Sequence, residues 1–505
     1  MPYSFSLKSI IGTFKKIFVF IGLVFCASLS AQANFDFNPN CIKAYQLIMQ
    51  LRVNEAKTLI TKEKQQNPEN GIPILLDNYV DYFTILTSES KADYDKLKKN
   101  KSIRLNLLDN QDENSPYYLF AQAEINIQWA LLKGKFQDYF SAAWDINNAD
   151  DLLNDNTKKF PNFLPNKKGK AIINIVLGAV PSNLQGILKT VGLNGSVANG
   201  VKDLEYLIAV LPKSNYNFYR DEVIFFYAFA QTEAVKNKNN QQKIIAYLDN
   251  LPNTSLLKSF LIGYVSIKNA QNDIALNYLL HRPQAAHYLN FTNIYYMIGN
   301  AKLNKIDTDA NLYLLKYIKE YRGLNFVKDS YLKLAYYYLL KSDNDKYKAY
   351  LKLVRSQGNI LIEKDKQALK EANDAPPNID LLKARLLFDG GYYNKALAQI
   401  KDKNIDDFKL ARDKIEFYYR LGRIYDESDK NIEAIIYYQK AINLGRNSTY
   451  YFAANAALSM GYIYEKEKDT VKARNFYTQA LEMKHHEYQN SIESKAKEGL
   501  KRLLK

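Results

Sequence analysis

Small and large apolar residues alternate along the chain in a way that predicts pairs of antiparallel helices. The clearest unit has an aromatic residue, Leu-Gly and a second aromatic on one segment, then Ala, an aromatic and Ala on the next. Its residues are Tyr418, Leu421, Gly422, Tyr425, Ala434, Tyr438 and Ala441. Two helices approach closely only where one presents Gly or Ala at the crossing, while large residues one turn away fill the groove beside it. The segment therefore predicts a closely packed helix pair.

The same pattern returns on both sides of this unit. It is repeated downstream by Gly461, Tyr464, Ala473, Tyr477 and Ala480, and upstream by Ala384, Leu387, Ala396 and Ile400. Measured at the small residue of the second helix, the steps from Ala396 to Ala434 to Ala473 are 38 and 39 residues. This series resembles the tetratricopeptide repeat, whose unit is about 34 residues, and it implies longer turns.

Weaker copies keep the twelve-residue separation of the two small residues. They are Gly263 and Ala275 with Leu279, Ala130 and Ala142 with Ile146, and Ala44 and Ala56 before Pro68, with more degenerate pairs around Gly299 and Ala335. The pattern defines no register between residues 70 and 260. We predict an all-α, tetratricopeptide-like α-solenoid, a right-handed superhelix of antiparallel helix pairs with a C-terminal capping helix.

Breaks in the pattern suggest a division of the chain. Asn373 to Pro377 reads as a turn, because proline cannot continue a helix, and residues 154–169, with Pro161 and Pro165, read as a loop. The predicted parts are helical hairpins over 34–165, an apolar insert over 166–212, degenerate hairpins over 213–372, well-formed repeats over 373–490 and a capping helix over 491–505. The alternative for the last part is an amphipathic helix lying on a membrane.

The first 33 residues have the features of an export signal. Lys8, Lys15 and Lys16 precede the apolar run from Ile17 to Leu29, and Ala31-Gln32-Ala33 forms an A-x-A cleavage site. The alternatives are a membrane anchor, for which the run is short, and a lipoprotein signal at Cys26, which follows Phe25 where a small residue is usual. We predict cleavage after Ala33 and a location in the periplasm or at the outer-membrane periphery.

The amino-acid composition and the net charge limit the fold classes and binding partners that fit this chain. Only 20 glycines and 13 prolines occur in 505 residues, which favours helices with short turns. The net charge is +16, or +13 without the three lysines of the signal, and it is scattered among Asp and Glu; with export, this argues against nucleic acid. Weak attraction to an anionic membrane or envelope surface stays possible. Cleavage would leave Cys41 as the single cysteine, so no disulfide can form within the chain.

Catalytic signatures are missing from the sequence. His281 and His287 lie six residues apart with no carboxylate at a ligand spacing, and the adjacent pair His485 and His486 follows a repeat helix and reads as an exposed end. No phosphate-binding Gly-x-x-x-x-Gly-Lys-Ser/Thr segment occurs, and Cys41 has no evident partner base. Glu493-Ser494 resembles the catalytic pair of soluble lytic transglycosylases, but only eleven residues follow Ser494. We expect no catalytic, metal or cofactor-binding residues.

The segment between residues 169 and 211 is the most individual part of the chain. The apolar run from Ala171 to Val180 ends at Pro181, and Gly195 and Gly200 follow. It reads as a buried insert, and the alternative is an apolar ligand or lipid contact over 171–193. Two segments resemble parts of the mitochondrial outer-membrane Iml-two and tetratricopeptide-repeat-thirty-nine group. They are Gly-Lys-Ala-Ile-Ile-Asn-Ile-Val-Leu-Gly-Ala-Val-Pro at 169–181 and Leu-Lys-Thr-Val-Gly-Leu-Asn-Gly at 188–195. Leu193 stands where that group usually has an aromatic residue. The resemblance implies an all-helical interaction scaffold.

These observations predict a non-catalytic scaffold or adaptor of the bacterial cell envelope. Its partner would be a protein or peptide held in the groove of the superhelix. The alternative is a membrane-docked factor for envelope assembly or lipid handling.

Overall fold

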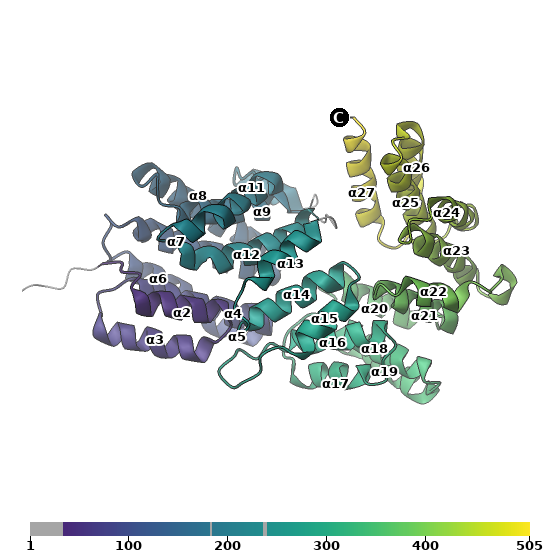
Figure 1. The fold of residues 1–505 in the computed structure, drawn as a ribbon, viewed down its shortest axis with the longest axis horizontal. Helices are drawn as coiled ribbons and strands as arrows, with labels where there is room; N and C mark the ends of the chain where they lie inside the picture. The colour runs from purple at the N-terminus through teal and green to yellow at the C-terminus, as the bar shows by residue number, and fades with distance from the viewer. Residues whose placement is uncertain (1–33, 182–183, 236–239, 505) are drawn as a thin grey trace, which may run out of the picture. The chain divides into compact units, whose positions relative to one another are not determined.

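The chain folds into consecutive helix pairs (Figure 1). The computed structural model describes residues 34–181, 184–235 and 240–504, and these contain helices and no β-sheet. The predicted export signal lies outside the described residues. The predicted fold class, an all-α tetratricopeptide-like solenoid with a C-terminal capping helix, is confirmed. Contacts divide the chain into unit 1, which runs to Lys258 and includes Pro283–Asn290, and unit 2, which holds the rest.

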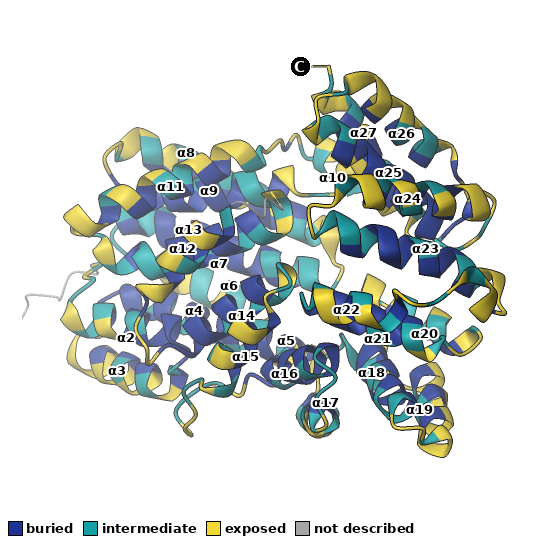
Figure 2. Ribbon diagram, turned by 45° about the vertical axis from the view of Figure 1, so that its right-hand side comes forward, coloured by how far each residue is buried: buried dark blue, intermediate teal, exposed yellow. Residues whose placement is uncertain are grey.

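Unit 1 contains the helices up to α13. Their bounds are α2 Pro39–Met49, α3 Val53–Gln66, α4 Ile72–Ser88, α5 Lys91–Leu97, α6 Asn100–Leu108, α7 Pro116–Lys135, α8 Tyr139–Lys159, α9 Pro165–Gly178, α10 Gln185–Thr190, α11 Val197–Val210, α12 Arg220–Phe229 and α13 Gln241–Asp249. The pairs α2 with α3, α7 with α8 and α9 with α11 pack along their lengths. Buried residues gather where these helices face one another (Figure 2).

Unit 2 begins within α14. Its helices are α14 Leu256–Lys268, α15 Asn272–Leu280, α16 Asn293–Asn304, α17 Ala310–Glu320, α18 Val327–Leu340, α19 Asn344–Ser356, α20 Glu363–Asn373, α21 Ile379–Asp389, α22 Tyr393–Ile400, α23 Ala411–Asp426, α24 Asn431–Gly445, α25 Phe452–Lys466, α26 Thr470–Glu482 and α27 Gln489–Arg502. From α16 onward they pack as pairs, apart from α20 and the last helix, α27. The first helix of each pair carries the first small residue of the repeat pattern.

In eight helix pairs the turn between the two helices uses one residue in the left-handed conformation. That residue stands seven positions after the first small residue in eight pairs: Leu51, Gln137, Ala270, Ile306, Ser342, Gly391, Asp429 and Lys468 follow Ala44, Ala130, Gly263, Gly299, Ala335, Ala384, Gly422 and Gly461. A left-handed residue reverses the chain at a helix end and satisfies the last carbonyls. The position of the turn residue thus defines the register of the weaker copies. These include the copy at Ala130, which lies in the region where the hydrophobic pattern defines no register.

The small residues lie where paired helices cross. A Cβ added to Gly422 would come within 3.0 Å of the Tyr438 ring, and one added to Gly461 within 3.0 Å of the Tyr477 ring. The opposite side of Tyr477 is closed by Gly499 of α27, where an added Cβ would also lie under 3.0 Å from the ring. Only glycine fits at these contacts, because the aromatic ring occupies the space of a side chain.

Stacked rings recur twelve residues apart in three of the pairs. They are Tyr338 with Tyr350 at 5.3 Å, Tyr425 with Tyr437 at 5.5 Å and Tyr464 with Phe476 at 5.5 Å between centroids. Each stack joins the end of a first helix to the middle of the second. The many tyrosines therefore serve pairing within the repeats as well as burial.

Two features of the 154–212 region differ from the sequence prediction. The loop predicted over 154–169 is wrong in its extent, because α8 continues to Lys159 and α9 begins at Pro165. Proline is compatible with the first turn of a helix, where its missing N–H has no partner to lose. The apolar run then packs inside unit 1, with Ala171, Ile172 and Leu177 buried. Among the described residues, no helix is both long enough and apolar enough to cross a membrane.

An ion cluster lies at the centre of unit 1. Lys168 Nζ is 2.6 Å from Glu124 Oε2 and 2.7 Å from Glu222 Oε2, and all three side chains are at most 4% exposed. The hydroxyl of Tyr45 donates to Glu222 at 2.5 Å and that of Tyr79 donates to Glu124 at 2.7 Å. The cluster therefore joins α2, α4, α7, α9 and α12 through buried polar contacts.

The cluster contains two carboxyl groups, those of Glu124 and Glu222, and one ammonium group, that of Lys168. Burial raises the pKa of Glu124, and Lys168 only partly offsets this effect. Burial opposes the charge on Lys168, but Glu124 and Glu222 outweigh it and raise the pKa of the ammonium group. Lys168 therefore stays charged, because a lone carboxylate pair in an apolar core would be far more costly than the ion cluster.

Candidate interaction surface

A polar stripe follows the first helices of unit 2 on the side turned away from the crossing. Tyr336, Arg385 and Arg423 each directly follow the small residue of their helix, which are Ala335, Ala384 and Gly422. One residue corresponds to a rotation of about 100° around the helix axis. Their side chains therefore point away from the paired second helix and are free to meet side chains from neighbouring pairs.

Six residues of this side form what we term the polar band. They are Tyr336 of α18, Glu371 of α20, Arg385 of α21, Glu416 and Arg420 of α23, and Tyr451 just before α25. Both terminal nitrogens of Arg385 donate to Glu371 Oε2 at 3.1 Å, and the Tyr336 hydroxyl donates to the same oxygen. The guanidinium group also lies 5.2 Å from the centre of the Tyr336 ring. This end of the band is thus a cation held between a carboxylate and an aromatic face.

The other end of the band is built on α23. Arg420 donates to Glu416 through Nε at 3.0 Å and Nη2 at 2.8 Å, and its guanidinium group lies 5.4 Å from the Tyr419 ring centre. The Tyr419 hydroxyl accepts from Asn455 of α25 at 2.6 Å. The rings of Tyr419 and Tyr451 meet edge to face at 5.7 Å. These contacts fix the arginine side chains in one orientation.

Glu371 and Arg385 stay ionised despite their burial. Burial opposes ionisation of Glu371, but the Arg385 guanidinium group outweighs it and holds the pKa of the carboxyl group below its usual value. Burial raises the pKa of the Tyr451 hydroxyl, so this side chain is a neutral donor. The Arg385 side chain keeps 22% exposure and Glu371 keeps 24%. The band is therefore pre-ordered, and solvent reaches it at Arg385 and Glu371, whereas Tyr336, Glu416 and Arg420 are buried.

The residues predicted as repeat-defining lie elsewhere, in the cores of the pairs. Ala384, Ala396, Ala434, Ala441, Ala473, Ala480, Leu421, Gly422, Gly461, Tyr438 and Tyr477 are buried, and Tyr418, Tyr425 and Tyr464 pack at the edges of the same cores. The hydroxyl of Tyr438 reaches Asp426 at 2.8 Å, and that of Tyr477 reaches Glu465. None of them belongs to the band. A polar residue directly after the small one is a signal that could have found two members of the band, Tyr336 and Arg385.

The histidines and the Glu493-Ser494 pair show no catalytic arrangement. His287 lies 3.5 Å from Glu55, and Nδ1 of His281 lies 2.8 Å from the carbonyl oxygen of Asn277, to which it donates. His486 is buried, which corrects the prediction that this pair is an exposed end; His485 is exposed. Hydrogen bonds from Lys484 and Gln489 hold the pKa of Glu493 at about 2. The described residues contain no group of three or more side chains suited to a metal ion.

Asp365 of α20 caps the start of α18 from outside that helix. Its Oδ2 accepts from the backbone N–H of Phe326 at 2.7 Å and its Oδ1 from that of Asp329 at 3.0 Å. Burial raises the pKa of the Asp365 carboxyl group to about 6, although these hydrogen bonds oppose the rise. The folded chain therefore holds a proton here between the unfolded pKa, near 3.8, and about 6.

Replacement of Asp365 by asparagine should change how the stability of unit 2 depends on pH. A raised folded pKa means that the wild type loses stability as pH rises toward 6, because the buried group must then ionise. We expect the stability of the wild type, relative to D365N, to fall by about 2–3 kcal/mol between about pH 4 and about pH 7.5. Urea unfolding at both pH values measures the difference. A parallel pH dependence of the two proteins would contradict the assignment.

Comparisons with known proteins add little beyond the fold. No family model matches the chain, and no curated protein matches it. A crystal structure of the APC/C hetero-tetramer Cut9-Hcn1 is similar to it with a TM-score of 0.24 and 13% identity, over 89% of this chain and 86% of that one. A crystal structure of yeast Tom70 gives a TM-score of 0.23 and 12% identity, over 91% and 94% of the two chains. Such values carry no argument about function, and the resemblance to the Iml-two group stays a prediction.

Proposed function

We propose that the chain is a non-catalytic adaptor of the bacterial cell envelope that binds a protein or peptide on the polar band of unit 2. The observation that carries this proposal is the pre-ordered set of arginine and tyrosine side chains supplied by α18, α21, α23 and the residue before α25. Tyrosine and arginine dominate the energetic centres of protein interfaces, since they combine a large contact area with directed hydrogen bonds. The predicted export signal supports the envelope location.

A paired substitution in the band tests this function. We expect R385Q/Y451A to weaken binding of the partner at least about ten-fold, because it removes a directed cation and an aromatic contact together. The partner is first identified by crosslinking and mass spectrometry in the native envelope, and its affinity is then measured with purified proteins. Circular dichroism checks that the variant stays folded.

A matched control carries the same two changes on the second-helix side of the unit. Tyr437 and Lys440 of α24 lie 5.3 Å apart, measured from the ammonium group to the ring centre, so K440Q/Y437A also removes one tyrosine and one cation. Its affinity should stay within about three-fold of the wild type. The adaptor proposal fails if no partner is captured reproducibly, or if both variants bind equally well.

A membrane-docked factor is the second candidate function. It is favoured by α10, none of whose residues is buried, and by the basic net charge of +16. Attraction to anionic headgroups grows as salt is lowered. Flotation with vesicles containing an anionic lipid, at low salt, distinguishes the candidates, because a chain that stays with the soluble fraction has no such docking.

A further inference from the structure

The helix α20 stands outside the pairing pattern and contributes a residue to the band. It lies between the pair α18–α19 and the pair α21–α22 and packs on α18 and α19. Its buried apolar side chains are two alanines, Ala368 and Ala372. Two alanine methyl groups contribute little hydrophobic stabilisation, of the order of 1 kcal/mol each. Hydrogen bonds and ion pairs must therefore hold α20 in place.

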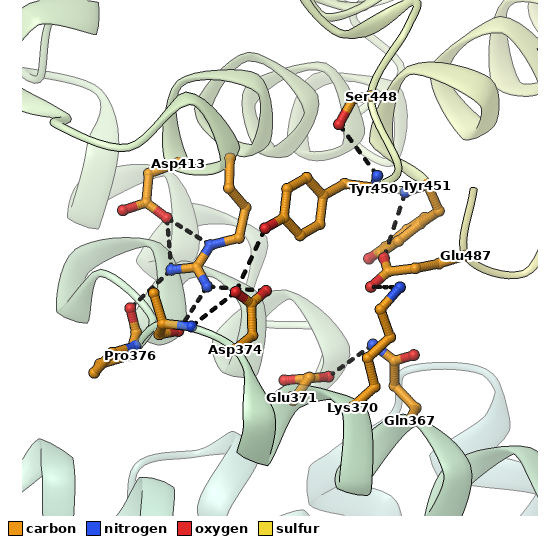
Figure 3. Close-up of polar contacts among 12 residues, drawn as sticks. Gln367, Lys370, Glu371, Asp374, Pro376, Asp413, Ser448, Tyr450, Tyr451 and Glu487 are labelled. Carbon is orange, nitrogen blue, oxygen red and sulfur yellow. Dashed lines mark hydrogen bonds and ion pairs between the residues drawn. The ribbon is translucent and has the colours of Figure 1, made fainter. Parts of the chain in front are cut away.

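The polar side of α20 reaches the turn before α27 and, through that turn, the residue before α25 (Figure 3). Lys370 Nζ is 2.9 Å from Glu487, in the turn before α27. Glu487 in turn accepts from the backbone N–H of Tyr451 at 3.4 Å, just before α25. The helix is thus linked by side chains to residues about a hundred positions away in sequence, across the spaces between pairs.

The turn after α20 makes a second set of bridges, to α23 and α25. Asp374 lies 3.4 Å from Arg412 Nη1 at the start of α23 and accepts from the Tyr450 hydroxyl at 3.4 Å. Arg412 also donates to the carbonyls of Ala375 and Pro376, both at 2.7 Å. Arg412 is fixed further by Asp413 at 2.9 Å. All these contacts are polar, and the partners come from different helix pairs.

We propose that α20 and the turn after it form an internal strap that closes the polar band and can open as a unit while the pairs beside it stay folded. In the closed state Arg385 and Tyr336 both donate hydrogen bonds to Glu371. These two side chains are therefore already bound to a carboxylate of the chain itself and are not available to a partner. Opening frees them. Segments with few buried apolar contacts open locally at a lower free-energy cost than the apolar cores beside them. The consequence for binding rests on the proposed function; the opening itself does not.

A charge-reversal cycle at the strap tests this inference by hydrogen exchange of the full chain. We expect K370E and E487K each to speed exchange of the amides of residues 363–373 by about ten-fold, since each places like charges together. The double variant K370E/E487K restores the opposite pair and should bring exchange back to within about two-fold of the wild type. The amides of α21, and those of α18 beyond Asp329, whose own N–H donates to Asp365 of the strap, should keep their protection in every variant.

The control lies on the same helix. Lys366 and Glu363 form an exposed pair at 2.8 Å one turn earlier, so K366E makes the same charge change without touching a later pair, and exchange should stay within about two-fold of the wild type. The strap is refuted if the single variants exchange like the wild type, if the double variant fails to restore protection, or if α20 opens only together with α18 and α21. No partner enters this measurement, so its outcome is independent of the capture experiment.

Discussion

Replacement of Gly461 by alanine should destabilise unit 2 by about 3 kcal/mol, because the new methyl group overlaps the Tyr477 ring. The ring cannot retreat, since Gly499 of α27 closes its other side equally tightly. Its hydroxyl is also tied to Glu465. Urea unfolding measures the loss, and hydrogen exchange should place it in α25, α26 and α27.

The chain offers both a rescue and a control for this substitution. In the pair α21–α22 the same two positions are held by Ala384 and Ile400, and both are fully buried. G461A/Y477I copies this combination and should recover most of the lost stability, because the branched aliphatic side chain leaves room for a methyl group. Gly134→Ala has no atom within 4 Å of the added Cβ, so it should be neutral or mildly stabilising. A G461A protein as stable as the wild type would show that the crossing is loosely packed.

Replacement of Lys168 by methionine should unfold unit 1 or destabilise it by about 3–5 kcal/mol, since two carboxylates would remain buried without a cation. The variant should lose less stability at acid pH than at neutral pH, because burial raises the pKa of Glu124 and favours its protonation. Thermal unfolding measured at about pH 5 and about pH 8 tests both expectations.

The triple variant K168M/E124Q/E222Q separates charge from shape at this cluster. It keeps the volume of the side chains and several hydrogen bonds but removes all three charges, so it should recover most of the stability and lose the pH dependence. A single K168M protein with normal stability at alkaline pH would show that the carboxylates are solvated, contrary to their exposure of 2% and 4%.

The sequence predicted the fold best at positions where the packing of two helices allows only one type of residue. Glycine at 422 and 461, with a large ring sixteen positions later, follows from the closeness of two helix axes, and this relation is local enough to be recognised without a structure. The extent of the loop before α9 was misjudged because Pro165 is equally compatible with a loop and with a first helical turn. Local pattern alone does not separate these two cases.

The functional surface was not predictable in the same way. Arg385 and Glu371 each look like an ordinary exposed helix residue, and they meet because α20 is placed beside α21 by contacts made elsewhere in unit 2. Lys168 was equally hidden, since its charged neighbours in sequence, Lys167 and Lys170, are also basic. Its acidic partners are 44 and 54 residues away. Such pairings depend on the stacking of helix pairs, which the repeat pattern indicates but does not resolve at the level of side chains.

The left-handed turn residues carry a consequence for the evolution and engineering of the chain. Seven of the eight are not glycine, although a side chain in that conformation costs about 1 kcal/mol. The fold therefore tolerates a small backbone strain in each of these hairpins, at the left-handed residue of its turn. Because neighbouring repeats contribute to stability almost independently, the exposed ones among these positions, Gln137, Ser342, Asp429 and Lys468, form a reserve from which heat tolerance could be raised stepwise.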